Sequence, residues 1–221
     1  DDKPVPDRAP IRGHRYRNPL SVTNDWTTAL TSRGCPFHCG FCNTPGYYGR
    51  TYRRHSPAYV VDELRYLRKL GYAEVFFRDD LFHAGHVGEL CEAMLAADLR
   101  LAWSCNHRVD TLDEPTLRLM HRAGCHTVKF GVESGDDTVL AGLDKPDHAM
   151  AERTFDLCRR IGIRTHAHLM IGLPGETREQ MARTVRLLHR LAPYSFTMGM
   201  FTPHPGSAFH ERLAAAGRTV G

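Results

Sequence analysis

Apolar residues recur along this chain in two alternating patterns: short β-rich runs, and longer stretches with an apolar residue every three or four positions. The β-rich runs predict strands over residues 27–31, 74–77, 101–105, 126–132, 165–171 and 196–201. One amphipathic stretch carries Val87, Leu90, Cys91, Met94 and Leu95 on a single helical face. We therefore expect Cys91 in the core, together with Cys158 on the inward face of a helix predicted over 149–161.

Local signals mark where several helices begin. Ser56 precedes Pro57, Asp113 precedes another amphipathic stretch, and Thr177 with Gln180 forms a capping box. Further helices are predicted over 138–143 and 209–216. Six successive strand–helix units predict an α/β fold, a partial (β/α)6 TIM-like barrel whose parallel sheet has outer helices. In such folds the functional residues lie at the C-terminal ends of the strands.

Composition narrows the class of protein. Residues 1–19, rich in Pro, Asp and Arg, form a linker-like N-terminal segment, and residues 20–221 hold the repeating units as one core domain. With 42% hydrophobic and 24% charged residues, the chain is too apolar to be disordered. No apolar run approaches the roughly 20 residues that span a bilayer. The net charge of +4 is small and scattered, which favours a small-molecule or peptide substrate over nucleic acid.

Three of the seven cysteines crowd together directly after the first predicted strand. Cys35, Cys39 and Cys42 have the spacing C-x3-C-x2-C, and three thiolates on one tight loop can hold three corners of a [4Fe–4S] cluster. A zinc site that uses His38 or a distant fourth ligand, or three thiols without metal, are the alternatives. Unpaired thiols in this pattern point to a reducing cytoplasm.

The cysteine loop, with the aromatic Phe41 before its third cysteine, resembles that of the radical S-adenosylmethionine (SAM) superfamily. The resemblance implies that Cys35, Cys39 and Cys42 are catalytic because they hold the cluster, and that SAM chelates its open iron. An electron from the reduced cluster, supplied by a donor such as flavodoxin or ferredoxin, would cleave SAM to a 5′-deoxyadenosyl radical. A barrel mouth would shield that radical from water.

The same resemblance implies a set of SAM contacts at the strand ends. They are Phe41, Asp80, Asn106, Arg108, Glu133, Ser134, Lys145, Ile171 and Gly172. Phe41 would lie beside the adenine, Asp80 would bind the ammonium, and Lys145 would pair with the carboxylate. Packing, helix capping, a surface ion pair and an ordinary strand-to-helix turn are the competing explanations. His166 and His168, which alternate on one strand face, either touch substrate or fill a polar barrel interior.

Longer stretches resemble the cobalamin-dependent branch of this superfamily. They are Thr31-Ser-Arg-Gly-Cys-Pro, Tyr52-Arg-Arg-His-Ser-Pro, Arg78-Asp-Asp, Gly131-Val-Glu-Ser-Gly, Gly172-Leu-Pro-Gly-Glu-Thr and Phe201-Thr-Pro-His-Pro-Gly. The branch implies methylation of a small metabolite or biosynthetic intermediate, with cobalamin as methyl carrier. The alternatives are a radical SAM oxidoreductase, dehydratase or cyclase without methyl transfer, and a non-enzymatic iron–sulfur or zinc binding module.

The branch normally has an upstream cobalamin-binding domain, which is absent from this chain. Pro6-Asp-Arg and Arg15-Tyr-Arg resemble the linker that follows that domain. We therefore expect a catalytic core without its cobalamin-binding domain, and also without a C-terminal domain that covers substrate.

Overall fold

The strand-forming runs assemble into one parallel sheet in a computed structural model that describes residues 1, 3–14 and 16–218. The six strands follow the order β1-β4-β5-β6-β7-β8, and every neighbouring pair is parallel. They are β1 (Trp26–Ala29), β4 (Glu74–Phe77), β5 (Ala102–His107), β6 (Cys125–Glu133), β7 (Arg164–Ile171) and β8 (Ser195–Met200). This arrangement confirms the predicted α/β class and the strand count.

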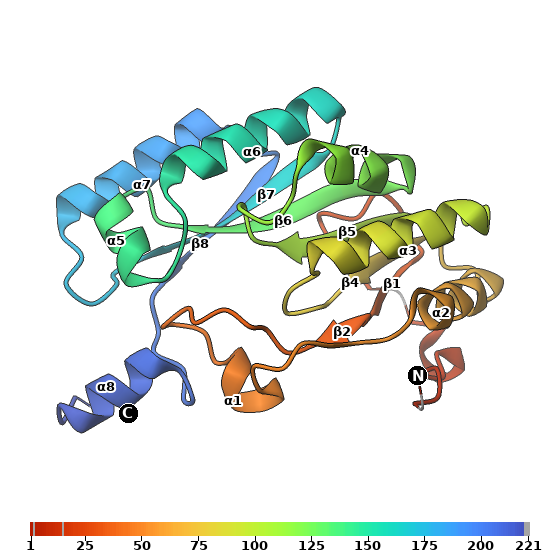
Figure 1. Cartoon of the computed structure of the whole chain (residues 1–221), viewed down its shortest axis with the longest axis horizontal. Coiled ribbons are helices and arrows are strands. Elements are labelled where there is room, and N and C mark those ends of the chain that lie inside the picture. The colour runs from red at the N-terminus through yellow and green to blue at the C-terminus, as the bar shows by residue number, and fades with distance from the viewer. Residues whose placement is uncertain (2, 15, 219–221) are drawn as a thin grey trace.

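Helices cover one face of this sheet. They are α2 (Pro57–Lys69), α3 (Ala84–Ala96), α4 (Glu114–Arg122), α5 (Asp137–Gly142), α6 (His148–Ile161) and α7 (Arg178–Leu191). Figure 1 shows α3, α4, α6 and α7 on one side, with the cysteine loop, α1 (Thr44–Tyr48) and α8 (Ala208–Ala215) on the other. The predicted caps form, since Ser56, Asp113 and Thr177 each accept a hydrogen bond from a backbone N–H of the first turn.

The main core lies between the sheet and these helices. Trp103 packs edge-on against Phe77 at a centroid distance of 5.5 Å, and both are fully buried. Cys91 and Cys158 are buried in the same core, as predicted. Burial raises the pKa of the Cys158 thiol to about 12, so it stays protonated and apolar. No helix of the described residues could span a membrane.

A two-stranded antiparallel sheet frames the cysteine loop, and the sequence patterns missed it. It pairs β2 (Ser32–Arg33) with β3 (Arg53–Arg54). The first strand therefore ends at Ala29 instead of continuing through the predicted range 27–31. The cause is Asp79, whose buried carboxylate accepts hydrogen bonds from the backbone and hydroxyl of Thr31 and from the hydroxyl of Ser32. These bonds draw the chain out of the sheet.

The last predicted helix does not cover the sheet. In α8 the backbone N–H of Phe209 donates to the carbonyl of Gly40 at 3.0 Å, so this helix lies against the cysteine loop. Its departure leaves Phe196 and Met200 of β8 exposed. The sixth strand–helix unit therefore differs from the other five in where its helix packs.

The N-terminal segment predicted as a linker packs against the body of the fold. The guanidinium of Arg8 donates to the carbonyl of Thr28 at 2.9 Å and lies 3.8 Å from the buried carboxylate of Glu63. The hydroxyl of Tyr66 donates to Asp7 at 3.0 Å. Arg15 of the linker motif lies outside the described residues.

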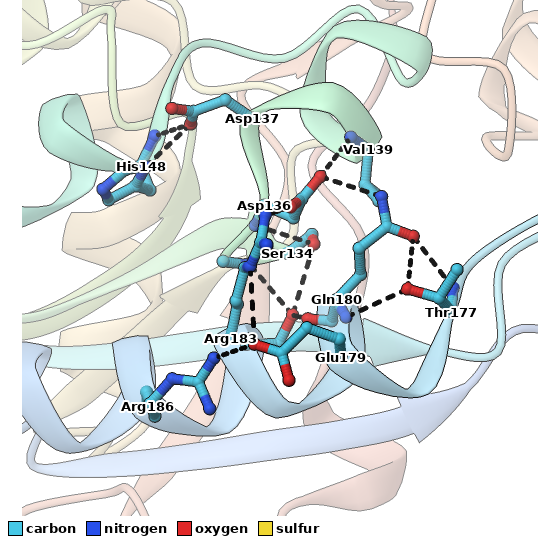
Figure 2. A network of polar contacts seen from close by, with 12 residues as sticks. Ser134, Asp136, Asp137, Val139, His148, Thr177, Glu179, Gln180, Arg183 and Arg186 are labelled. Atoms are coloured by element: carbon cyan, nitrogen blue, oxygen red, sulfur yellow. Dashed lines mark hydrogen bonds and ion pairs between the residues drawn. The ribbon is translucent and has the colours of Figure 1, made fainter.

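A polar network fastens the loop after β6 to α7 (Figure 2). The hydroxyl of Thr184 accepts from the backbone N–H of Gly135 at 2.9 Å and lies 3.2 Å from the hydroxyl of Ser134. Asp136 accepts from Gln180 at 3.1 Å and from Arg183 at 2.6 Å. The network fixes the start of the loop that leads through α5 to Lys145.

Replacing Gly135 by Ala should destabilise this junction. An added Cβ would lie 2.6 Å from the carbonyl oxygen of Arg183 and 2.7 Å from Thr184 Cα, both backbone atoms that cannot move independently. We expect the free energy of unfolding in urea to fall by about 1–3 kcal/mol. Gly142→Ala is the matched control, because an added Cβ there meets nothing within 4 Å. Equal stability of the two variants would contradict the tight contact.

Candidate active site

One pocket of about 490 Å³ opens at the C-terminal ends of the central strands, beneath the cysteine loop. Nine of the predicted site residues line it: Cys35, Cys39, Phe41, Cys42, Asp80, Asn106, Arg108, Glu133 and Lys145. They come from five separate segments of the chain. The geometry therefore brings together most of the residues that the sequence marked.

The three cysteines of the loop are half-buried free thiols that face this pocket. The Sγ atom of Cys39 accepts a hydrogen bond from Arg108 at 3.5 Å, and that of Cys42 accepts one from the backbone N–H of Thr44 at 3.4 Å. Burial raises the pKa of the Cys35 and Cys39 thiols, and the positive charges of Lys145 and Arg108 offset only part of that rise at Cys39. The donors stabilise thiolates, which are the form that binds metal.

Among the described residues no group of three His, Cys, Asp or Glu side chains is placed to hold a single metal ion. A cubane asks for a different arrangement, because each of its thiolates binds a different iron. The three thiols of the loop line one pocket, and the positive charge of Arg108 would offset the negative charge that such a cluster carries.

Arg108 is held rigidly beside the cysteine loop. Its guanidinium forms two hydrogen bonds of 3.0 Å with Asp110, donates to the carbonyl of Asp144 at 3.3 Å, and stacks 3.9 Å from the centre of the Phe37 ring. The sequence motif suggested a contact to ribose or carboxylate. The structure adds a contact to Cys39 that no local pattern announced.

Lys145 and Glu133 form a buried ion pair at the pocket wall. Their charged atoms lie 2.8 Å apart, and the side chains are only 6% and 8% exposed. Lys145 also donates to the carbonyl of Gly131 and lies 5.7 Å from the centre of the Phe41 ring. A surface ion pair, the alternative explanation for Lys145, is therefore wrong. A glycine at position 131 provides the space for this ion pair, because a Cβ there would lie 2.4 Å from Glu133 Oε1.

Three predicted residues do not line the pocket. Ser134 is fully buried, and its hydroxyl faces Thr184 of α7 (Figure 2). Ile171 ends β7, and Gly172 follows in the left-handed region with a φ of +78°. The backbone N–H of Gly172 donates to Glu176 at 2.6 Å, which closes a strand-to-helix turn. The structure gives all three residues structural partners, and their contact with SAM stays a prediction.

The two aspartates after β4 have different roles. Asp80 is exposed at the pocket and lies within 3.4 Å of the Thr44 hydroxyl. Asp79 is buried beneath the cysteine loop, and burial raises its pKa to about 6 despite hydrogen bonds from Ser32 and Thr31. The assignment of Asp80 to the ammonium of SAM is compatible with its place at the pocket.

Sequence reasoning missed several pocket residues, notably Phe37, Phe76, Arg78 and Lys129. A signal for Lys129 existed, because it alternates with Gly131 and Glu133 along β6 and so faces the same side. His168 lines the pocket, and His166 lies deeper, bonded to Ser195 at 2.8 Å. The centres of the two imidazole rings lie 4.5 Å apart on the same side of β7, as their alternation predicted.

Comparison with known proteins decides the family. Residues 30–188 match the family model of the Radical SAM superfamily. The chain belongs to this superfamily. An uncharacterized methyltransferase of Pyrococcus horikoshii is 32% identical over 193 residues, which cover 84% of this chain and 41% of the relative. The cytidylyl-2-hydroxyethylphosphonate methyltransferase of Streptomyces wedmorensis is 35% identical over 178 residues, which cover 75% of this chain and 33% of that relative.

A solved structure shows the same fold. The radical SAM methyltransferase TsrM from Kitasatospora setae, with cobalamin and a [4Fe–4S] cluster bound, superposes with a TM-score of 0.81 at 24% identity. The match covers 86% of this chain and 36% of TsrM, so the chain spans well under half of these relatives. Membership confirms the expected superfamily, with its [4Fe–4S] cluster and SAM as cofactors.

The histidines inside the barrel should make the fold sensitive to acid. Burial lowers the pKa of His166 to about 4, and His168 and Lys129 lower it further by repulsion. Between about pH 6.5 and pH 4 the unfolded chain therefore binds a proton that the folded chain does not, and stability falls with falling pH. His166→Gln should reduce the fall in the free energy of unfolding between pH 7 and pH 4.5 by about 1–3 kcal/mol, measured by urea unfolding at each pH.

The exposed His189 of α7 supplies the control for this measurement. His189→Gln should leave the pH dependence as it is in the unmodified chain. If His166→Gln loses as much stability on acidification as the unmodified chain does, His166 is not held neutral.

Proposed function

We propose that this chain is the catalytic core of a cobalamin-dependent radical SAM methyltransferase that acts on a small metabolite or biosynthetic intermediate. The observation that carries the proposal is the meeting of three cysteine thiols, the Lys145–Glu133 pair and the ring of Phe41 around one pocket. A cluster site and a set of groups suited to SAM then share one enclosed space, which is what reductive cleavage of SAM requires.

Each of the pocket residues has a part in this proposal. Cys35, Cys39 and Cys42 bind one iron each of a [4Fe–4S] cluster, which supplies the electron that cleaves SAM. Arg108 donates to the Cys39 sulfur, and Asp110 and Phe37 hold the guanidinium in place. This donation moderates the negative charge of the thiolates.

The remaining groups suit the parts of SAM by charge and shape. Lys145 offers a cation to the carboxylate, and Asp80 offers an anion to the ammonium. Phe41 presents an aromatic face for the adenine, and Glu133 accepts from hydroxyl groups. Asn106 lines the pocket as a further polar group within reach of ligand hydroxyls. The rings of Phe37 and Phe76 keep the pocket wall apolar and limit the access of water.

Methyl transfer is the favoured outcome because relatives at 32% and 35% identity are methyltransferases by name. TsrM, which shares the fold, binds cobalamin. The runner-up is radical chemistry without methyl transfer, supported by the anaerobic magnesium-protoporphyrin IX monomethyl ester cyclase of Rubrivivax gelatinosus at 31% identity. A one-electron donor such as flavodoxin or ferredoxin completes the proposal.

The reconstituted chain should cleave SAM. With iron, sulfide and dithionite under anaerobic conditions, we expect SAM-dependent production of 5′-deoxyadenosine, measured by mass spectrometry. Cys39→Ala should lose both the iron and the product, because two thiolates hold a cube poorly. Cys158→Ala, which changes a core thiol on α6, should retain both. Stoichiometric zinc with negligible iron in the purified chain would refute the cluster site.

The same assay distinguishes the two kinds of radical chemistry. With methylcobalamin added, methyl transfer predicts consumption of methylcobalamin that depends on SAM and on the cluster. Production of 5′-deoxyadenosine with methylcobalamin left intact, across the acceptors tested, would favour the runner-up.

Lys145→Met should weaken SAM binding and leave the cluster in place. Loss of a buried cation that pairs with a carboxylate should raise the dissociation constant about tenfold or more. Equilibrium dialysis with labelled SAM gives the affinity, and iron analysis gives the cluster content. Lys69→Met is the control, because Lys69 is exposed on α2. In Lys145→Met the buried carboxylate of Glu133 loses its partner, which can destabilise the fold. The double variant Glu133→Gln, Lys145→Met removes that unpaired charge, so weak SAM binding in it reflects the loss of the lysine and not a loss of stability.

A further inference from the structure

A second lysine lies deeper in the same pocket, and none of the roles above uses it. Lys129 on β6 is 8% exposed, and it lines the pocket. Its Nζ atom lies 3.6 Å from the centre of the Phe76 ring. Among residues 1, 3–14 and 16–218, no hydrogen-bond acceptor or carboxylate pairs with this ammonium. Because the pocket is open at Lys129, the N–H donors of its ammonium are available to a ligand.

Another basic side chain, Arg78, lies close to Lys129 in the pocket. The guanidinium of Arg78 lies 5.2 Å from the centre of the same Phe76 ring, and His168 lines the same pocket. Burial lowers the pKa of Lys129, and Arg78 lowers it further. Glu74, at the start of β4, is held instead by His126 at 3.0 Å and by the backbone N–H groups of Val22 and Thr23.

The sheet register places this lysine one inward-facing position deeper than Gly131, the residue that contacts Lys145. Lys129 pairs with Asn106 on β5 and with His166 on β7, whereas Gly131 pairs one step nearer the strand ends with His168. Lys145 lies at the level of Gly131 and already has Glu133 as its partner. Of the two lysines in the pocket, Lys145 has a carboxylate partner, and Lys129 has none among the described residues.

We propose that Lys129 binds an anionic group of the substrate, a carboxylate or a phosphate, and so anchors the substrate on the floor of the barrel. The inference rests on the proposed function, because it takes the open side of the pocket for SAM. The amide of Asn106 and the guanidinium of Arg78 line the same pocket and can add hydrogen bonds to the anion's oxygens. A neutral, apolar substrate would leave the buried ammonium without a counter-charge.

The chain is well suited to a direct test, because Lys3, Lys69, Lys129 and Lys145 are its only lysines. Carbon-13 labelling at Cε gives one NMR signal for each lysine in the anaerobically reconstituted chain. Titration with acetate and with inorganic phosphate, against sodium chloride at matched ionic strength, should shift the Lys129 signal saturably. The signal of the exposed Lys69 should not follow. The anion that binds more tightly identifies the class of the substrate group.

Lys129→Met assigns the signal and supplies the matched loss of charge. The anion-dependent rise in the unfolding temperature should then weaken by about tenfold in apparent affinity. If that variant fails to fold, replacement of each of the other three lysines by Arg assigns the Lys129 signal by subtraction.

Two results would overturn the proposal. One is a Lys129 signal that neither anion shifts in the folded chain. The other is displacement of bound acetate by S-adenosylhomocysteine, which has the carboxylate of SAM, because Lys129 would then serve SAM and not the substrate. No reductant is used, so these outcomes are independent of whether the chain produces 5′-deoxyadenosine.

Discussion

All strands of the main sheet run parallel, and this single constraint makes the pocket. Parallel strands end at a common edge, so the segments that follow β1, β4, β5 and β6 must approach one another there. The cysteine loop follows the first strand, and Arg108 and Glu133 come from the ends of β5 and β6. The site therefore depends on the parallel topology, and the apolar layer between sheet and helices stabilises that topology.

The two faces of the sheet differ in polarity: one packs in the apolar core, and the other lines the pocket. One face supplies residues such as Val128 and Phe130 to the core, and the alternating positions Lys129 and Gly131 face the pocket. Charged and imidazole groups on the pocket face lose solvation, which lowers the pKa of His166 and His168 to about 4. The apolar face offsets that cost and allows the pocket to keep groups that do not contribute to stability.

Electrostatic pairing divides the pocket into two regions. Near the mouth the cations are matched, Arg108 by Asp110 and Lys145 by Glu133. Deeper in the pocket, Lys129 lies against the face of Phe76 and has no ion-pair partner in the described part of the chain. The mouth is thus organised before any ligand arrives, and the floor is organised to receive a negative charge. The hydrogen bonds of Ser134 and Asp136 to α7 help to position Lys145, because they fix the start of the loop that carries it.

The sequence alone predicted the six strands of the main sheet, most of its helices and the cluster-binding cysteines. Strand periodicity and caps such as Ser56 and Thr177 are local, and the spacing of Cys35, Cys39 and Cys42 is a property of one loop. Sequence patterns did not predict contacts between residues that are far apart in the chain. The contact of Arg108 with Cys39 joins residues 69 positions apart, and α8 rests on Gly40, far back in the chain.

Ser134 illustrates the limit most clearly. Its motif was visible in the sequence, but the packing of α7 turned its hydroxyl away from the pocket. Lys129 illustrates the converse, since its residue type was visible and its lack of an acceptor was not. Local propensity and spacing act within a few residues, whereas burial and pairing are set by whichever segments the sheet brings alongside, and only the tertiary structure decides those.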